Sequence, residues 1–118
     1  MFRFESLEIW KLAINYANHL YIVAKTFPKE EMFGLGDQLR RAAVSISNNI
    51  AEGSGGTNRD FSNYLNVAVK STLETVNILY FAKERKFINE AERIRLYDEA
   101  EKLIRKIRAF KKSLNSNQ

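Results

Sequence analysis

The sequence has no cysteine, one proline and one histidine among its 118 residues. Without cysteine the chain forms no disulfide and no thiolate metal site, and it carries no cysteine nucleophile. The single histidine, His19, is too few for a zinc site or for the Glu-x-x-His pairs of di-metal helical bundles. We therefore predict neither a metal nor a cofactor, and a chain suited to a reducing cytosol.

The groups that most catalytic sites need are also scarce. His19 is the sole candidate for a histidine base, and no strand-turn-helix pattern surrounds a nucleophilic serine. The run from Gly53 to Gly56 lacks the Gly-Lys-Ser/Thr ending of a phosphate loop and follows a predicted helix, so we interpret it as a helix stop and linker. Helix-bundle ribonucleases need a histidine beside an arginine, and no such local arrangement is present. We predict that the protein is not an enzyme and has no catalytic residue.

Long apolar runs are missing as well. No stretch approaches the roughly 20 apolar residues that a membrane-spanning helix needs. Residues 1–10 include Glu5 and Glu8 and lack the apolar core of a secretory signal. These observations predict a cytoplasmic protein with no membrane association.

Positive charge is in excess: the formal net charge is +5 and the sequence pI is about 9.6. A basic balance favours acidic partners such as nucleic acid or anionic lipid. Many small helical proteins are equally basic without such a partner, so the net charge alone does not show that the protein binds one.

Proline and glycine divide the sequence into four segments. Pro28 follows the first segment, Gly34 and Gly36 precede the second, and the run from Gly53 to Gly56 separates the second from the third. Within each segment apolar residues recur at three- and four-residue spacing, which predicts amphipathic helices. The predicted helices span about residues 6–27, 37–52, 58–86 and 89–114, with Ser6, Asp37, Asn58 and Asn89 as N-caps.

Similar helix lengths and short connections favour antiparallel neighbours. The predicted fold is all-α: one domain, residues 1–118, forming an antiparallel up-down-up-down four-helix bundle. The third helix has a second apolar stripe, which consists of Tyr64, Val67, Ser71, Ile78 and Phe81. A helix that is apolar on two faces has two neighbours to satisfy. We expect one of these faces to meet another subunit in a homo-oligomer.

Basic residues crowd the end of the fourth helix. They are Lys102, Arg105, Lys106, Arg108, Lys111 and Lys112, with no acidic residue among them. Arg105, Arg108 and Lys112 fall on one side by their spacing, and the others extend it. This pattern fits either a solvated face with cations favourably placed at a helix C-terminus or a stripe that contacts phosphates.

The second helix carries a polar line beside its apolar side. Its members are Gln38, Arg41, Ser45, Asn49 and Glu52. On a monomer this would be a solvent face. Uncharged Ser45 and Asn49 between alanine and isoleucine also suit hydrogen-bonded contacts between helices or subunits. We assign the line to structure rather than to ligand binding.

The same helix carries a recognisable motif. The run from Gln38 to Ile46, QLRRAAVSI, is followed by Asn49 to Gly53, NIAEG, and preceded by FPKEE at 27–31. Together with LEIWKLA at 7–13 and the segment 61–68, it resembles the 23S rRNA-intervening-sequence proteins. More distantly, it is similar to the accessory variability determinant of diversity-generating retroelements. Ser47-Asn48 stands where a proline followed by a small residue is common in the family, which implies a straighter helix.

The resemblance implies a four-helix protomer in a ring-like homopentamer. The family name describes the location of a gene within ribosomal RNA, not an activity. The retroelement relatives are associated with reverse transcriptase and nucleic acid through a basic surface, so by analogy Arg40, Arg41 and the C-terminal cations are candidates for binding RNA or DNA. The alternative is a protein-interaction adaptor that docks a partner such as a polymerase or reverse transcriptase.

Overall fold

The computed structural model describes residues 1–116; residues 117 and 118 of the predicted domain lie outside the described part. Four long helices follow one another along the chain: α1 (Glu8–Ala24), α2 (Leu35–Gly53), α3 (Asn58–Glu84) and α4 (Glu90–Ser116). Two short 3-10 helices, η1 (Arg3–Ser6) and η2 (Lys29–Glu31), precede α1 and α2. The prediction of an all-helical chain with four helices is confirmed, and residues 1–116 contain no strand.

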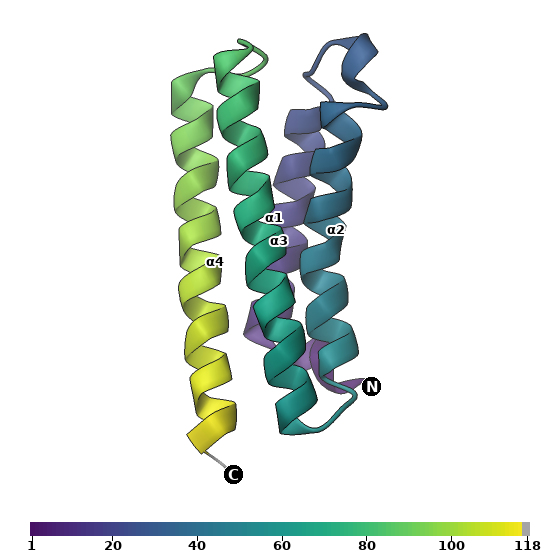
Figure 1. Cartoon of the computed structure of the whole chain (residues 1–118), viewed down its shortest axis with the longest axis vertical. Helices are drawn as coiled ribbons and strands as arrows, with labels where there is room; N and C mark the ends of the chain where they lie inside the picture. Colours follow the sequence, from purple (N-terminus) through teal and green to yellow (C-terminus); the bar gives the residue numbers. More distant parts are fainter. Residues whose placement is uncertain (117–118) are drawn as a thin grey trace.

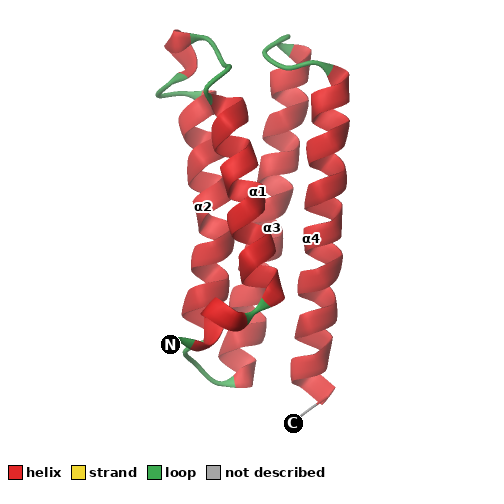
Figure 2. Cartoon of the chain, turned by 180° about the vertical axis from the view of Figure 1, so that it is seen from behind, coloured by secondary structure: helices red, strands yellow, loops and turns green. Residues whose placement is uncertain are grey.

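The four helices lie roughly parallel to one long axis (Figure 1). The α1–α2 and α3–α4 connections lie at one end of the bundle, and the α2–α3 connection lies at the other end (Figures 1 and 2). Helices α1 and α3 each pack against both α2 and α4. Helices α2 and α4 therefore occupy opposite sides of the bundle.

One apolar core fills the space between the helices. Its largest fully buried side chains are Tyr16, Leu20, Leu39, Ile46, Ile50, Phe61, Leu65, Leu79, Leu96, Leu103 and Ile107. All four helices contribute to this set at three- and four-residue spacing, as an amphipathic pattern requires. No helix within residues 1–116 has the length and apolar character that crossing a lipid bilayer demands.

Two predicted helix starts are wrong. Ser6 belongs to η1, and α1 begins at Glu8 with Leu7 at the N-cap position. Asp37 lies inside the first turn of α2, whose N-cap position is Gly34. The carboxylate of Glu31 accepts the N–H of Leu35 at 3.1 Å. Glu31, which precedes α2, therefore takes the capping role predicted for Asp37.

The start of α3 also differs from the prediction. Thr57, not Asn58, is the N-cap: its Oγ1 accepts the N–H of Asp60 at 3.1 Å, and the Asp60 carboxylate accepts the N–H of Thr57 at 3.2 Å. These two bonds form a capping box. For α4, Asn89 is the cap that the sequence indicates, because its Oδ1 accepts the N–H of Glu92 at 2.8 Å.

The ends of α1, α2 and α3 also differ from the predicted bounds. Helix α1 ends at Ala24, short of the predicted end at residue 27. The chain then continues through a turn to Phe27. Gly53 is the last residue of α2 and is buried against α3, where an added Cβ would lie 2.7 Å from Cβ of Tyr64. Beyond α3, Lys86 has a φ of 65°, in the left-handed region. The N–H of Phe87 then bonds to the carbonyl of Ala82 at 2.8 Å, which closes the helix in a Schellman-type turn.

Candidate nucleic-acid interface

The packing of α4 between α1 and α3 divides the predicted cationic stripe between two faces. Lys106 faces α1, where its Nζ lies 3.4 Å from Oε1 of Glu8. Lys111 faces α3, where its Nζ donates to Oδ1 of Asn66 at 2.8 Å. Neighbouring residues on a helix point in different directions. The six cations between residues 102 and 112 therefore do not share one surface.

On the α1 side, Lys102 borders a hollow that is also lined by Leu12, Asn15, His19 and Glu99. Nδ1 of His19 lies 2.9 Å from both carboxylate oxygens of Glu99. The side chains of His19 and Glu99 therefore form a polar contact between α1 and α4. Lys106 is paired with Glu8, whereas Lys102 has no ion pair within the described residues and shares its hollow with the Glu99 carboxylate.

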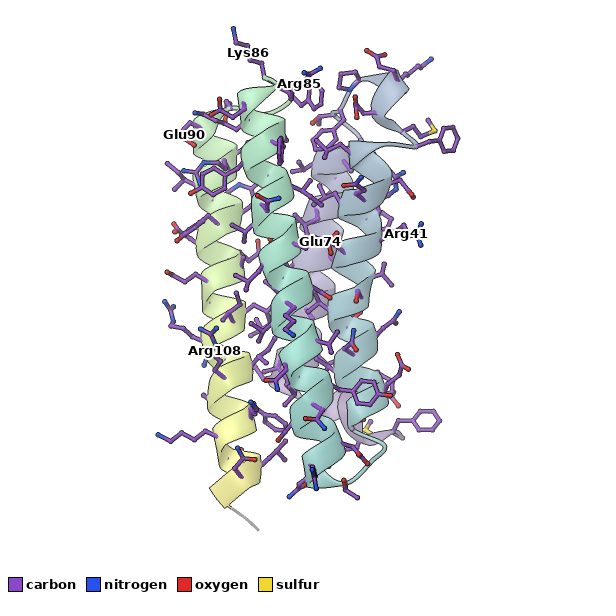
Figure 3. The ribbon with its side chains drawn as sticks, in the orientation of Figure 1. Arg41, Glu74, Arg85, Lys86, Glu90 and Arg108 are labelled. Carbon is purple, nitrogen blue, oxygen red and sulfur yellow. The ribbon has the colours of Figure 1, made fainter. Side chains whose placement is uncertain are left out.

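On the α3 side, the cations are freer. Arg105 donates to Oε1 of Glu101 at 3.3 Å, through an exposed pair one turn apart. Arg108 has no ion pair or hydrogen bond from its side chain within the described residues, and it projects from the surface of α4 in Figure 3. Lys112 is exposed further along the same helix. Arg108 and Lys112 carry no ion pair within the described residues, and the Arg105 pair is exposed, so these three are the cations of this side that can contact an anion.

A groove runs between α3 and α4 beneath these cations, and we call it the α3–α4 groove. Its first hollow, of about 300 Å³, is lined by Leu73, Val76, Tyr97, Ile104, Arg105 and Arg108, together with Glu101. The second, of about 350 Å³, is lined by Asn66, Val69, Lys70, Ile107 and Lys111, and it shares Leu73 and Arg108 with the first. The shared residues make the two hollows one continuous feature.

Arg93 bounds the groove at the end nearer the α3–α4 turn. Its guanidinium lies 4.3 Å from the ring centre of Tyr80 and 5.9 Å from that of Tyr97. A side-chain hydrogen bond from Arg93 to Glu90 lowers the pKa of the Glu90 carboxyl and raises the pKa of Arg93. Arg93 is thus held in place by two aromatic rings and a carboxylate.

Arg40 and Arg41 lie elsewhere. Nη2 of Arg40 donates to the carbonyl of Met32 at 2.7 Å, and Arg41 lies 3.8 Å from the Asp37 carboxylate. Both residues belong to α2, on the opposite side of the bundle from α4; Figure 3 shows Arg41 and Arg108 on opposite sides. One chain therefore does not bring these arginines together with the C-terminal cations.

The polar line of α2 faces α3 at its centre. Oγ of Ser45 lies 2.9 Å from Oγ of Ser71, which joins the two helices. Asn49 donates through Nδ2 to the carbonyl of Ser45 at 2.7 Å and to its Oγ at 3.1 Å. Gln38 and Glu52, at the two ends of the line, are exposed.

The described part of the chain contains no group of three or more His, Cys, Asp or Glu residues that could hold a metal ion. The sequence did not single out Leu73 and Tyr97, which line the α3–α4 groove. Leu73 is 50% exposed and Tyr97 is 37% exposed. In the sequence such residues resemble core positions, and only the placement of the neighbouring helix shows that they are open.

Together these features define a basic four-helix protein whose candidate site is a surface groove rather than an enclosed pocket. Residues 5–109 match the model of the 23S rRNA-intervening sequence protein family, and the chain belongs to that family. The resemblance seen in the α2 motif is thereby confirmed.

A solved structure has the same fold. It is a protein with unknown function from the S23 ribosomal protein family of Bacteroides thetaiotaomicron VPI-5482. The similarity has a TM-score of 0.80 at 21% identity and covers 88% of this chain and 98% of that one. At this identity the likeness shows the fold alone. No curated protein matches the sequence.

Proposed function

We propose that the protein is a non-enzymatic, cytoplasmic nucleic-acid-binding bundle that works as a homo-oligomer with up-down-up-down protomers. The solvent-exposed cations in the second half of α4 carry this proposal. Arg105, Arg108 and Lys112 contact phosphates of RNA or DNA, and the binding is electrostatic with little dependence on base sequence.

The charge balance of the chain supports the proposal. The net charge is +5, and Arg108 and Lys112 carry no ion pair within the described residues. Binding of a polyanion to such cations is favourable because the polyanion releases its own counterions when it binds. Five copies of a +5 chain would carry about +25, a field that attracts polyanions from all directions.

Self-association would use another face. Tyr64, Val67 and Phe81 lie on the second apolar stripe of α3 and remain 37%, 44% and 57% exposed. Ser71, on the same stripe, bonds to Ser45 of α2, so this face lies on the α2 side of α3. A partly apolar face of this kind suits contact with a second copy. We propose a pentamer, as the family resemblance implies, that assembles through this face and not through the α3–α4 groove.

The test is binding of the nuclease-treated protein to labelled structured RNA and duplex DNA, across a salt titration, with the oligomer mass measured by light scattering. We expect affinity to fall steeply with salt. Replacing Arg105, Arg108 and Lys112 together by alanine should weaken binding at least tenfold and flatten the salt dependence.

The matched control replaces Lys11, Lys25 and Lys29 by alanine. These lysines are exposed and unpaired within the described part of the chain, and the control removes the same three charges from outside the groove. Equal losses in the two variants would assign binding to overall charge rather than to α4. No binding at low salt by an intact oligomer would refute the proposal and favour the adaptor that docks an acidic protein surface.

A further inference from the structure

We propose that the ligand of the α3–α4 groove is a single strand of RNA or DNA, with phosphates against the cations at its edges and bases against Leu73 and Tyr97. This inference rests on the proposed nucleic-acid function and specifies the class of nucleic acid. It also adds Leu73, Tyr97 and Lys70 to the candidate binding residues.

The floor of the groove is apolar and open to solvent. Leu73 is 50% exposed and Tyr97 is 37% exposed, while Val76 and Ile104 lie beneath them. Contact between these apolar side chains and flat, weakly hydrated rings is favourable. Bases stack on exposed aromatic side chains regardless of base sequence. A duplex keeps its bases inside its own stack and presents phosphates and sugars, so it cannot use this floor.

The edges of the groove are cationic on both helices. Lys70 comes from α3, and Arg105, Arg108 and Lys111 come from α4. Glu101 is the one acidic residue among the groove-lining residues that the structure describes, and it lies against Arg105. A ligand that fits must therefore combine negative charge along its length with flat apolar groups. Each nucleotide of a single strand supplies one phosphate and one base.

The length of the groove also suits a strand. From Tyr97 to Lys111 the α4 axis rises by about 21 Å at 1.5 Å per residue. At one end the Arg93 guanidinium lies over the ring of Tyr80 and 5.9 Å from the ring centre of Tyr97, which stays 37% exposed, whereas Asn66 and Lys111 line the other end. Single-strand sites on OB folds hold roughly 4–16 nucleotides, so an oligouridine of about 12 nucleotides is a probe of suitable length.

The experiment compares the affinity of the full protein for labelled oligouridine with its affinity for an RNA duplex of equal length. We expect the single strand to bind at least fivefold more tightly. Tyr97→Ala should weaken single-strand binding about tenfold, because base–aromatic stacking is lost, and should leave duplex binding nearly unchanged. Tyr21→Ala is the matched control, since Tyr21 is 40% exposed on α1, outside the groove, and its loss should change neither affinity.

A second measurement needs no variant. A strand containing 5-bromouridine is cross-linked to the wild-type protein by light, and the attached peptide is identified by mass spectrometry. Attachment within the segments 66–76 or 97–111 supports the groove.

The outcomes separate this inference from the function on which it rests. If strand and duplex bind equally and Tyr97→Ala has no effect, while the triple arginine–lysine variant still loses affinity, the groove inference is overturned and nucleic-acid binding stands. If neither nucleic acid binds at low salt, both are overturned, and binding of an acidic amphipathic peptide would then identify a protein-docking groove. A change in oligomer mass on Tyr97→Ala would show a subunit contact and also overturn the inference.

Discussion

The hydroxyl oxygens of Tyr16 on α1 and Thr75 on α3 lie 2.8 Å apart at the centre of the bundle. Thr75 donates its own proton to the carbonyl of Thr72 at 2.6 Å, so Tyr16 is the donor of the pair. Both residues are 0% exposed. This bond satisfies polar atoms that water does not reach, and its loss is therefore measurable.

Removing either partner should destabilise the fold. Tyr16→Phe should lower the free energy of unfolding by about 1 kcal/mol, because a hydrogen bond is lost. Thr75→Val should cost about 2 kcal/mol, because it leaves a buried tyrosine hydroxyl without an acceptor. Since the double variant has no orphaned hydroxyl, its cost should be smaller than the sum of the two. Urea denaturation measures all four proteins, and additive losses would contradict the proposed pairing.

Tyr16 should also make stability depend on pH in the alkaline range. Burial raises the pKa of the Tyr16 hydroxyl well above its usual range. Above pH 10 the unfolded chain loses this proton while the folded chain keeps it, so stability that is fully present below pH 10 falls as pH rises. By pH 11 the loss should be about 1.4 kcal/mol. Denaturation midpoints at pH 8 and pH 11 should show this loss in the wild type and less of it in Tyr16→Phe, and equal losses would refute it.

Gly53 should not tolerate a side chain. A Cβ at this position would lie 2.7 Å from Cβ of Tyr64 and 2.9 Å from Cδ1 of Phe61. Gly53→Ala should therefore destabilise the protein by about 1–3 kcal/mol, through forced separation of α2 from α3. Gly55→Ala is the control, because its Cβ would meet only the Glu52 carbonyl at 3.5 Å. Thermal unfolding compares the two variants, and similar melting temperatures would argue against close packing at Gly53.

Replacing Lys86 by glycine should stabilise the fold. Its φ of 65° costs a non-glycine residue about 1 kcal/mol, and glycine is the usual residue at this position of a Schellman-type turn. Lys86→Gly should raise the free energy of unfolding by about 0.5–1 kcal/mol. Lys86→Ala removes the same charge but keeps the strained backbone, so it should give no gain. If both variants stabilise equally, the cause is the lost charge and not the turn.

Asn49→Leu should disturb folding or assembly rather than ligand binding alone. The substitution removes the amide that bonds to the carbonyl and the hydroxyl of Ser45, beside the contact with Ser71. Asn48→Leu is the matched control, because Asn48 is an exposed residue of α2 that takes no part in the Ser45, Asn49 and Ser71 contacts. Light scattering and urea denaturation should show a loss of mass or of stability for Asn49→Leu alone. An intact, stable oligomer would contradict the structural assignment of the polar line.

The sequence was a good guide to the helices and to their buried sides, because apolar spacing records the helical period. It was a poorer guide to helix starts. Asp37 and Asn58 have capping chemistry, but Glu31 and Thr57 perform these roles. The Thr57–Asp60 spacing is a capping-box signature in the local sequence, whereas the contact of Glu31 with Leu35 depends on the short turn before α2. Asn89 was identifiable because it immediately precedes the first turn of its helix.

The candidate site was only partly predictable for a related reason. The cations of α4 follow one another in the sequence, yet α1 engages Lys106 and α3 engages Lys111. Their division depends on which helices flank α4, and this is a property of packing. Leu73 and Tyr97 were missed because helical spacing does not distinguish a core position from the floor of a groove.

The hydroxyl bonds of α3 also limit how the bundle moves. Ser71 is tied to α2 and Thr75, one turn further along, is tied to α1. A slip of either neighbour by one turn, about 5.4 Å, would leave hydroxyls without partners among aliphatic side chains. These two contacts therefore favour one register of α3 against both of its neighbours. Any ratchet of α1 or α2 past α3 would have to break at least one of them.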